Sequence, residues 1–196
     1  MNHNLLTYVI IFFVLVMIIK IYRESETFQL KCILSNVDGK SYCVRERNKL
    51  QLVADLLAEI TQNMKKLVVY LGEKYPSREN VKRLVKNFNP RKISETLPTS
   101  KYTAYSENKG EKLAFCTTTT KTGNKLIDKN TLMFVALHEL SHIATKSVGH
   151  TTEFWQNFKF LIENAKKIGI YNPIDYKKSP KEYCGMTISD SPYYDL

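Results

Sequence analysis

The chain begins with an almost wholly apolar segment in which the first charged side chain is Lys20. No Asp, Glu, Lys or Arg occurs before Lys20, and residues 5–22 read LLTYVIIFFVLVMIIKIY. As a helix this segment would be about 27 Å long at ~1.5 Å per residue, close to the bilayer core of about 30 Å. Because all its faces are apolar, it does not resemble a surface helix of a soluble domain. The pattern predicts a transmembrane helix over residues 5–22.

A cleaved signal peptide is the main alternative for this segment. The preceding MNHN carries no Lys or Arg, and the following YRESETFQ offers no small-residue cleavage site. An uncleaved membrane anchor is therefore favoured. Lys20 and Arg23 flank its C-terminal end, so the positive-inside tendency predicts that the C-terminal domain lies on the cytosolic side. Glu24 and Glu26 keep that charge bias small.

Two helical patterns follow the predicted anchor. Between about residues 47 and 71, apolar side chains recur at steps of three and four, which predicts a long amphipathic helix. A shorter helix is predicted over residues 77–87, with Ser77 as its N-cap.

Two stretches are typical of β structure. A DG turn signal at 38–39 lies between short β-prone runs, which predicts a small hairpin or linker at 24–45. Residues 90–126 are predicted to hold strands and loops. Two β-rich runs there flank the KG pair at 109–110 and indicate an antiparallel pair.

The next helix is surrounded by apolar side chains. Residues 131–144 read TLMFVALHELSHIA, and either Asp128 or Asn130 can cap their N-terminus. Apolar residues on all faces predict a central, buried helix. A further helix with one apolar stripe is predicted over residues 151–168, with Thr151 as its N-cap.

The charge balance adds candidate partners. The 196 residues carry a net charge of +10, which fits nucleic acid, an anionic membrane surface, an acidic protein, or simply a solvated lysine-rich surface. Residues 78–92 are the most basic region. We interpret them as a solvated helix face or as a patch for nucleic acid or lipid headgroups. The basic side chains in question are Arg78, Lys82, Lys86, Arg91 and Lys92.

The four cysteines are widely scattered and form no C-x-x-C pair, which argues against a cysteine zinc ribbon. The pattern favours reduced thiols in a domain that faces the cytosol. A bridge between Cys32 and Cys43 is the alternative, and it would indicate the opposite compartment.

Three of the chain's four histidines lie in the stretch HELSHIATKSVGH at 138–150. His138 and His142 are four apart on a helix, so they project side by side and can share one Zn²⁺ ion. Glu139 can reach a metal-bound water. A catalytic zinc takes three protein ligands and leaves one position open, and His150 is the third candidate, delivered by a turn at Gly149.

The alternative is a chance motif on an ordinary core helix. Burying two histidines and a glutamate on an apolar helix without partners would cost several kcal/mol. A purely structural zinc would more often have four protein ligands and no spare glutamate. The spacing therefore favours a catalytic metal site.

HELSH followed by GHTTEFW resembles the minimal zincin metallopeptidases of the WLM and SprT-like kind. Residues 109–192, with NTLMFVALHELSH, IGIYNPIDY and EYCGMTISDSP, are especially similar to WLM-like proteins of large DNA viruses. The resemblance covers roughly the C-terminal half, and the spacing differs from the longer metzincin motif.

The resemblance implies that His138, His142 and His150 ligate Zn²⁺ and that Glu139 is the general base. It implies an α+β, zincin-like fold with the active-site helix packed beside a small sheet. Met186 is either a methionine turn beneath the metal or an ordinary core methionine, and Tyr183 is a candidate oxyanion donor.

These observations divide the chain into a transmembrane anchor at 1–23, a linker or hairpin at 24–45 and a metallopeptidase domain at 46–196. The predicted function is a single-pass, zinc-dependent peptidase that hydrolyses peptide bonds of a protein or peptide substrate through a zinc-bound water. It would lie in a host membrane, or in a virion membrane if the protein is viral. The alternatives are a non-catalytic zinc-fold membrane or virion component, a protease acting on DNA-bound proteins, and a zinc hydrolase of non-peptide bonds.

Overall fold

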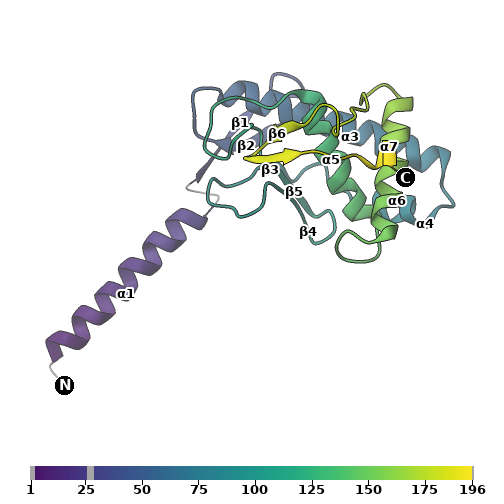
Figure 1. Cartoon of the computed structure of the whole chain (residues 1–196). Helices are drawn as coiled ribbons and strands as arrows, with labels where there is room; N and C mark the ends of the chain where they lie inside the picture. Colours follow the sequence, from purple (N-terminus) through teal and green to yellow (C-terminus); the bar gives the residue numbers. More distant parts are fainter. Residues whose placement is uncertain (1–2, 26–28, 196) are drawn as a thin grey trace.

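The N-terminal apolar segment is a single helix that projects from the rest of the protein. The computed structural model describes residues 3–25 and 29–195, and its first element is α1 (His3–Glu24). Side chains are exposed around the whole helix, which extends away from the body (Figure 1). The helix is long and apolar enough to cross a membrane. The predicted helix is confirmed, and its insertion into a bilayer stays a prediction.

The body combines a five-stranded sheet, a two-stranded sheet and several helices, which confirms the predicted α+β class. After α1, the elements along the chain are β1 (Leu30–Leu34), β2 (Ser41–Arg45), α3 (Leu50–Lys74), α4 (Glu79–Asn87), β3 (Ile93–Glu95), β4 (Ala104–Glu107), β5 (Lys112–Phe115), α5 (Lys129–Ala144), α6 (Thr152–Lys167), β6 (Lys181–Tyr183), β7 (Met186–Ile188) and α7 (Pro192–Asp195).

The larger sheet has the order β1-β2-β3-β5-β4. The predicted hairpin at 24–45 is present as β1 and β2, and β2 also pairs in parallel with β3. The antiparallel pair predicted around 109–110 is present as β4 and β5. Its turn has positive φ angles at Asn108 (46°) and Lys109 (56°), as expected where two strands reverse direction tightly. β4 therefore lies at one edge of the five-stranded sheet.

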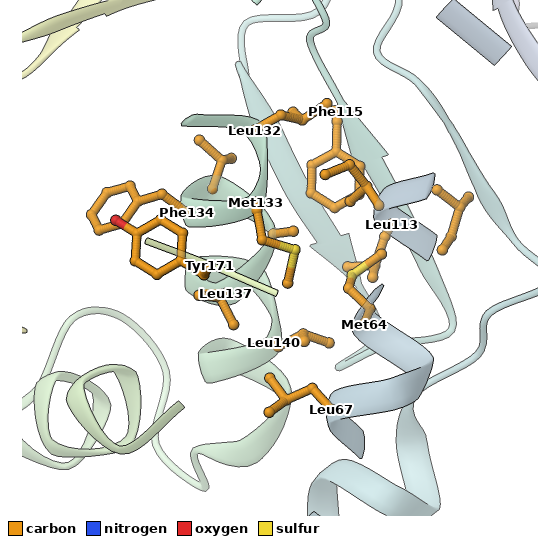
Figure 2. Packing of buried hydrophobic residues seen from close by; sticks show 14 of the residues in the cluster. Met64, Leu67, Leu113, Phe115, Leu132, Met133, Phe134, Leu137, Leu140 and Tyr171 are labelled. Atoms are coloured by element: carbon orange, nitrogen blue, oxygen red, sulfur yellow. The ribbon is translucent and has the colours of Figure 1, made fainter. Parts of the chain in front are cut away.

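The core centres on α5, as its apolar sequence predicts. Figure 2 shows Met133 and Leu140 of α5 beside Met64 of α3 and Leu113 of β5. On another side of α5, Phe134 lies beside Tyr171, with ring centroids 6.1 Å apart. Helices α3, α4 and α6 and strand β4 all contact α5. These contacts hold the histidine-bearing helix from several sides.

Two of the three predicted N-caps are present in the structure. Asp128 caps α5, because its carboxylate accepts from the Thr131 N–H at 2.9 Å. Thr151 caps α6 and accepts from the Phe154 N–H. The cap predicted at Ser77 is wrong, because α4 begins at Glu79 after Arg78 and has no side-chain cap. A capping residue one position too early cannot reach the free N–H groups of the first turn.

Candidate metal centre

Helix α5 presents His138 and His142 on one side. The two residues are one turn apart, and their Nε2 atoms lie 3.2 Å from each other. Both imidazoles are partly buried, and their ring centroids are 4.9 Å apart. The helix that carries them is otherwise almost wholly buried, so the two nitrogens are held on a rigid support.

His150 joins them from the segment between α5 and α6. Its Nε2 atom lies 3.0 Å from that of His138. Gly149, with a φ of +83°, lets the chain turn just before His150. The cap at Thr151 then starts α6 immediately afterwards. The structure thus brings together the three histidines that the sequence predicted to share a metal.

The donor set suits a zinc ion. Ligand nitrogens of all three histidines lie within 4.8 Å of one another. Tetrahedral zinc with Zn–N bonds of about 2.0–2.1 Å needs nitrogens about 3.3 Å apart, which the observed 3.0 and 3.2 Å approach. Burial, followed by the neighbouring His142 and His150, lowers the pKa of His138 to about 3. Burial, followed by His150, lowers that of His142 to about 4. Neutral imidazoles have the free lone pairs that a metal requires.

The ring of Phe154 packs against all three imidazoles. This fully buried ring of α6 lies 4.9, 4.4 and 4.7 Å from the ring centroids of His138, His142 and His150. The next residue, Trp155, packs against His150 at 5.7 Å. The aromatic pair in the sequence therefore positions the ligands and limits their rotamers.

Glu139 is a buried carboxylate without a compensating partner. It is 5% exposed, and no hydrogen bond to its carboxylate occurs among the residues described. Burial raises its pKa to about 8. Buried polar groups are normally satisfied, and an unpaired carboxylate with a perturbed pKa beside a cleft is typical of a functional site.

The segment that delivers His150 is held by charges that the sequence did not reveal. The Lys109 ammonium donates to the backbone carbonyls of Thr145 and Ser147 at 2.9 and 2.8 Å, and to that of His142 at 3.3 Å. A cation at the C-terminal end of a helix is favourable because the last carbonyls lack helical partners. The turn at 109–110 was predicted, but not its contact with α5.

Arg83 and Glu153 hold the same segment from a second direction. Arg83 donates from Nε to the Ala144 carbonyl at 2.8 Å and pairs with Glu153 at 2.9 Å. The Glu153 carboxylate also accepts the backbone N–H groups of Lys146 and Ser147. The position of His150 thus depends on α4, the β4–β5 turn and α6 together.

Two cavities meet at the histidines. A cleft of about 1100 Å³ is lined by β4 and the 97–102 segment and also by His138, His142 and His150. A smaller cavity of about 390 Å³ is lined mainly by apolar side chains, including Phe134, Trp155 and Met186. Glu139 borders both, so its carboxylate faces the space that a substrate would occupy.

Met186 and Tyr183 both lie near this space. Met186 is 49% exposed at the rim of the smaller cavity. The interpretation as an ordinary core methionine is therefore wrong, whereas a methionine turn beside the metal stays a prediction. Tyr183 is buried, and its hydroxyl donates to the Thr103 carbonyl at 3.1 Å. That hydrogen bond already uses the proton that an oxyanion donor would need.

The prediction of reduced, scattered thiols is wrong. Cys32 and Cys43 face each other across β1 and β2 and form a disulfide. Cys116 and Cys184 form a second disulfide over 68 residues, which ties the β6–β7 hairpin to the segment after β5. The sequence scatter misled because pairing depends on the fold, which brings residues far apart in the chain together.

The basic region at 78–92 is less free than its sequence implies. Arg78 stacks on Phe160 with its guanidinium 4.1 Å from the ring centroid. Lys82 pairs with Glu79, Lys92 pairs with Glu111, and Arg83 faces inward. A nucleic-acid partner for this region stays a prediction.

The fold and site describe an α+β protein with three clustered histidines beside a buried carboxylate. No family model matches this chain. It is 34% identical over 171 residues to the uncharacterized protein R325 of Acanthamoeba polyphaga mimivirus, which covers 85% of each chain. The chain belongs to the family of that viral protein.

Two further relatives match shorter segments. The chain is 44% identical over 59 residues to the uncharacterized protein 042R of Invertebrate iridescent virus 3, covering 30% of this chain and 36% of that one. It is 40% identical over 57 residues to the uncharacterized protein 136R of Invertebrate iridescent virus 6, covering 29% and 31%. All three relatives are viral, which supports the predicted viral affiliation.

A crystal structure of Wss1 from Saccharomyces cerevisiae is similar with a TM-score of 0.47 and 18% identity, covering 64% of this chain and 86% of that chain. Because a TM-score under 0.5 does not establish a shared fold, the WLM-like fold stays a prediction.

Proposed function

We propose that this protein is a membrane-anchored, zinc-dependent metallopeptidase of the WLM and SprT-like kind. One observation carries the proposal. Three histidine nitrogens converge beside a buried, unpaired carboxylate at the meeting point of two cavities. Four protein ligands would close a structural zinc site, whereas His138, His142 and His150 supply three.

In the proposed mechanism, His138, His142 and His150 hold the ion, and Phe154 and Lys109 keep them in place. A bound zinc would polarise the scissile carbonyl and lower the pKa of water at the site towards ~7. Glu139 then accepts the proton of the attacking water and delivers it to the leaving amine. Glu139 borders both cavities, which puts it beside the space where a substrate would bind.

Protein or peptide substrates are supported by the edge strand of the sheet. β4 lines the larger cleft, and its outer edge pairs with no other strand in the part of the chain that the structure describes. An extended peptide can add to such an edge through main-chain hydrogen bonds. The cleft has a volume of about 1100 Å³ and is lined both by β4 and by the three histidines.

The paired cysteines change the proposed side of the membrane. The cytosolic placement rested on reduced thiols and on a charge bias of Lys20 and Arg23, which Glu24 and Glu26 offset. Disulfides persist mainly in oxidising surroundings. We therefore place the body on the oxidising side of the anchor or in a virion. All four cysteines are paired, so an impermeant reductant followed by an impermeant maleimide tests this placement. Intact membranes should be labelled only where the body faces the exposed side.

The function is tested on the full chain in detergent micelles. Metal per chain is measured, and a peptide library is incubated with wild type and with Glu139→Gln. We expect one zinc per chain in both proteins and cleavage by wild type alone. Stoichiometric zinc without cleavage by wild type would instead favour a non-catalytic zinc-fold membrane or virion component. Equal cleavage by both proteins would contradict the role of Glu139.

A further inference from the structure

The base of α1 lies at one end of the cleft that leads to the histidines. The Thr99 hydroxyl donates to the carbonyl of Arg23 in the last turn of α1 at 2.8 Å. Glu24, the last residue of that helix, lines the cleft together with residues of the 97–102 segment. His138, His142 and His150 line the same cleft. One continuous cleft therefore connects the end of the anchor helix with the proposed metal site.

The segment beside the end of α1 has the side chains of a membrane interface. Tyr102 is 53% exposed, and the Lys101 ammonium lies 5.0 Å from its ring centroid. On α1, Tyr22 is likewise exposed, near Lys20 and Arg23. Tyrosine and lysine are enriched at the level of lipid headgroups, where an apolar stem and a polar tip are both satisfied. Two separate parts of the chain thus present such residues at the same end of the body.

From these two observations, and resting on the proposed function, we infer that the cleft opens onto the membrane surface and takes the juxtamembrane segment of a membrane protein as its substrate. Such a segment leaves the bilayer beside α1, passes Lys101 and Tyr102 in extended form, and follows β4 to the histidines. At ~3.3 Å per residue, an extended segment spans the cleft from the end of α1 to the histidines with a short stretch of chain, so the bond to be cleaved lies close to the bilayer in sequence.

The proposed preference for bonds close to the bilayer would not arise from confinement to the membrane alone. Any substrate in the same bilayer gains effective concentration, but a short anchor connection also fixes the height of the cleft. A scissile bond far from the bilayer would have to fold back to reach it. Distance from the membrane, rather than membrane attachment, is therefore the variable to test.

The experiment uses the full chain in phosphatidylcholine vesicles that contain phosphatidylserine. Two substrates carry the same cleavable segment after a transmembrane helix, one about 8 residues from it and one about 40 residues from it through a Gly/Ser spacer. We expect the near substrate to be cleaved about tenfold faster, with confinement equal for both. Equal rates would overturn the inference while leaving the peptidase proposal intact. Absence of Glu139-dependent cleavage of any substrate, free or anchored, would overturn the peptidase proposal itself.

A spacer inserted into the enzyme instead of the substrate also tests whether the height of the cleft above the bilayer matters. A flexible insertion of about 20 residues directly after Ser25 adds a connection with an r.m.s. end-to-end distance of roughly 25 Å, so the height of the cleft above the bilayer is no longer fixed. We expect the preference for the near substrate to be lost. The matched control is the same insertion ahead of α1, which leaves the connection unchanged and should keep the preference. An unchanged preference in the first variant would contradict the inference.

A spectroscopic measurement is independent of cleavage. Trp155 is the chain's single tryptophan, so Trp155→Phe provides a dark background. In it, Tyr102→Trp should be quenched by lipids brominated near the headgroup. Val85→Trp is the control, because this exposed position on α4 lies at the opposite end of the body from α1 (Figure 1). Equal quenching at both positions would overturn the proposed orientation of the cleft.

Discussion

Glu95 and Glu139 are both buried carboxylates, but they differ in the hydrogen bonds that they accept from the protein. Glu95 is fully buried on β3 and accepts the Arg45 N–H at 2.8 Å, the Thr117 hydroxyl at 2.7 Å and the Arg47 guanidinium. Glu139 accepts no hydrogen bond among the residues described. A buried charge that the protein itself hydrogen-bonds contributes to structure, whereas one that borders a cavity without a protein partner is typical of a functional site.

The basic side chains of the two regions also make different contacts. The Arg45 guanidinium donates to the Thr96 and Lys121 carbonyls, both at 2.6 Å, and to the Thr96 hydroxyl at 2.8 Å. It links β2 to two loops. Lys109 instead donates to backbone carbonyls at the C-terminal end of α5, and no ion pair with Glu139 occurs among the residues that the structure describes. Hydrogen bonds from the protein, rather than burial, therefore separate the structural carboxylate Glu95 from the candidate functional carboxylate Glu139.

The largest expected effect comes from Glu139→Gln. The amide cannot act as a base, so cleavage of a peptide library substrate should fall by about 10² to 10⁴-fold. Zinc content should be unchanged, and the midpoint of thermal unfolding should stay equal or rise, since an unpaired buried carboxylate is removed. A large loss of stability in this variant would erase the contrast with Glu95.

The reverse outcome is expected for Glu95→Gln. The neutral amide loses its charge-assisted bonds and leaves Arg45 and Arg47 buried without a counter-charge. We expect about 3–5 kcal/mol less free energy of unfolding, measured by urea denaturation. Folded protein should keep its zinc. A stability equal to that of wild type would show that the cluster around Glu95 is not structural.

A smaller effect is expected at the segment that carries His150. Lys109→Met removes the ammonium that holds the Thr145 and Ser147 carbonyls, so His150 should be less well positioned. Zinc affinity, measured by competition with a chelator, should fall about tenfold. Lys92→Met is the control, because it removes the same charge from an exposed pair with Glu111. Equal effects of both variants would mean that net charge, not position, matters.

The smallest effect is expected for Tyr183→Phe. This change removes one buried hydrogen bond, to the Thr103 carbonyl, and should cost about 1 kcal/mol of stability. Cleavage measured on folded protein should change by less than about threefold. A loss approaching that of an oxyanion donor, about 10² to 10³-fold, would instead give Tyr183 the catalytic role that the sequence suggested.

Local patterns in the sequence were enough to predict the helices around the site. Apolar residues on every face predicted that α5 is central, and Asp128 and Thr151 predicted two helix starts, because caps and periodicity act within a few residues. The convergence of His150 with His138 followed from the motif and a glycine turn. Their roles as ligands, and that of Glu139 as base, stay predictions.

Long-range contacts were not predictable in the same way. Lys109 reaches carbonyls 33 to 38 residues away, and Cys116 pairs with Cys184 over 68 residues. Neither partner is marked by any local pattern, because only the folded sheet and helices bring them together. Arg83 was hidden within a basic stretch that looked solvated, although it faces the end of α5.

The placement of α4 limits what its charges can influence. α1 and α4 lie at opposite ends of the body (Figure 1), and a domain of this size is roughly 40 Å across. Ions in physiological solution screen charges over about 8 Å. Lys86 and its neighbours are therefore several screening lengths from any bilayer that holds α1. Anionic lipids in that bilayer should leave α4 unaffected, and whatever the exposed lysines of α4 attract must approach from the aqueous side.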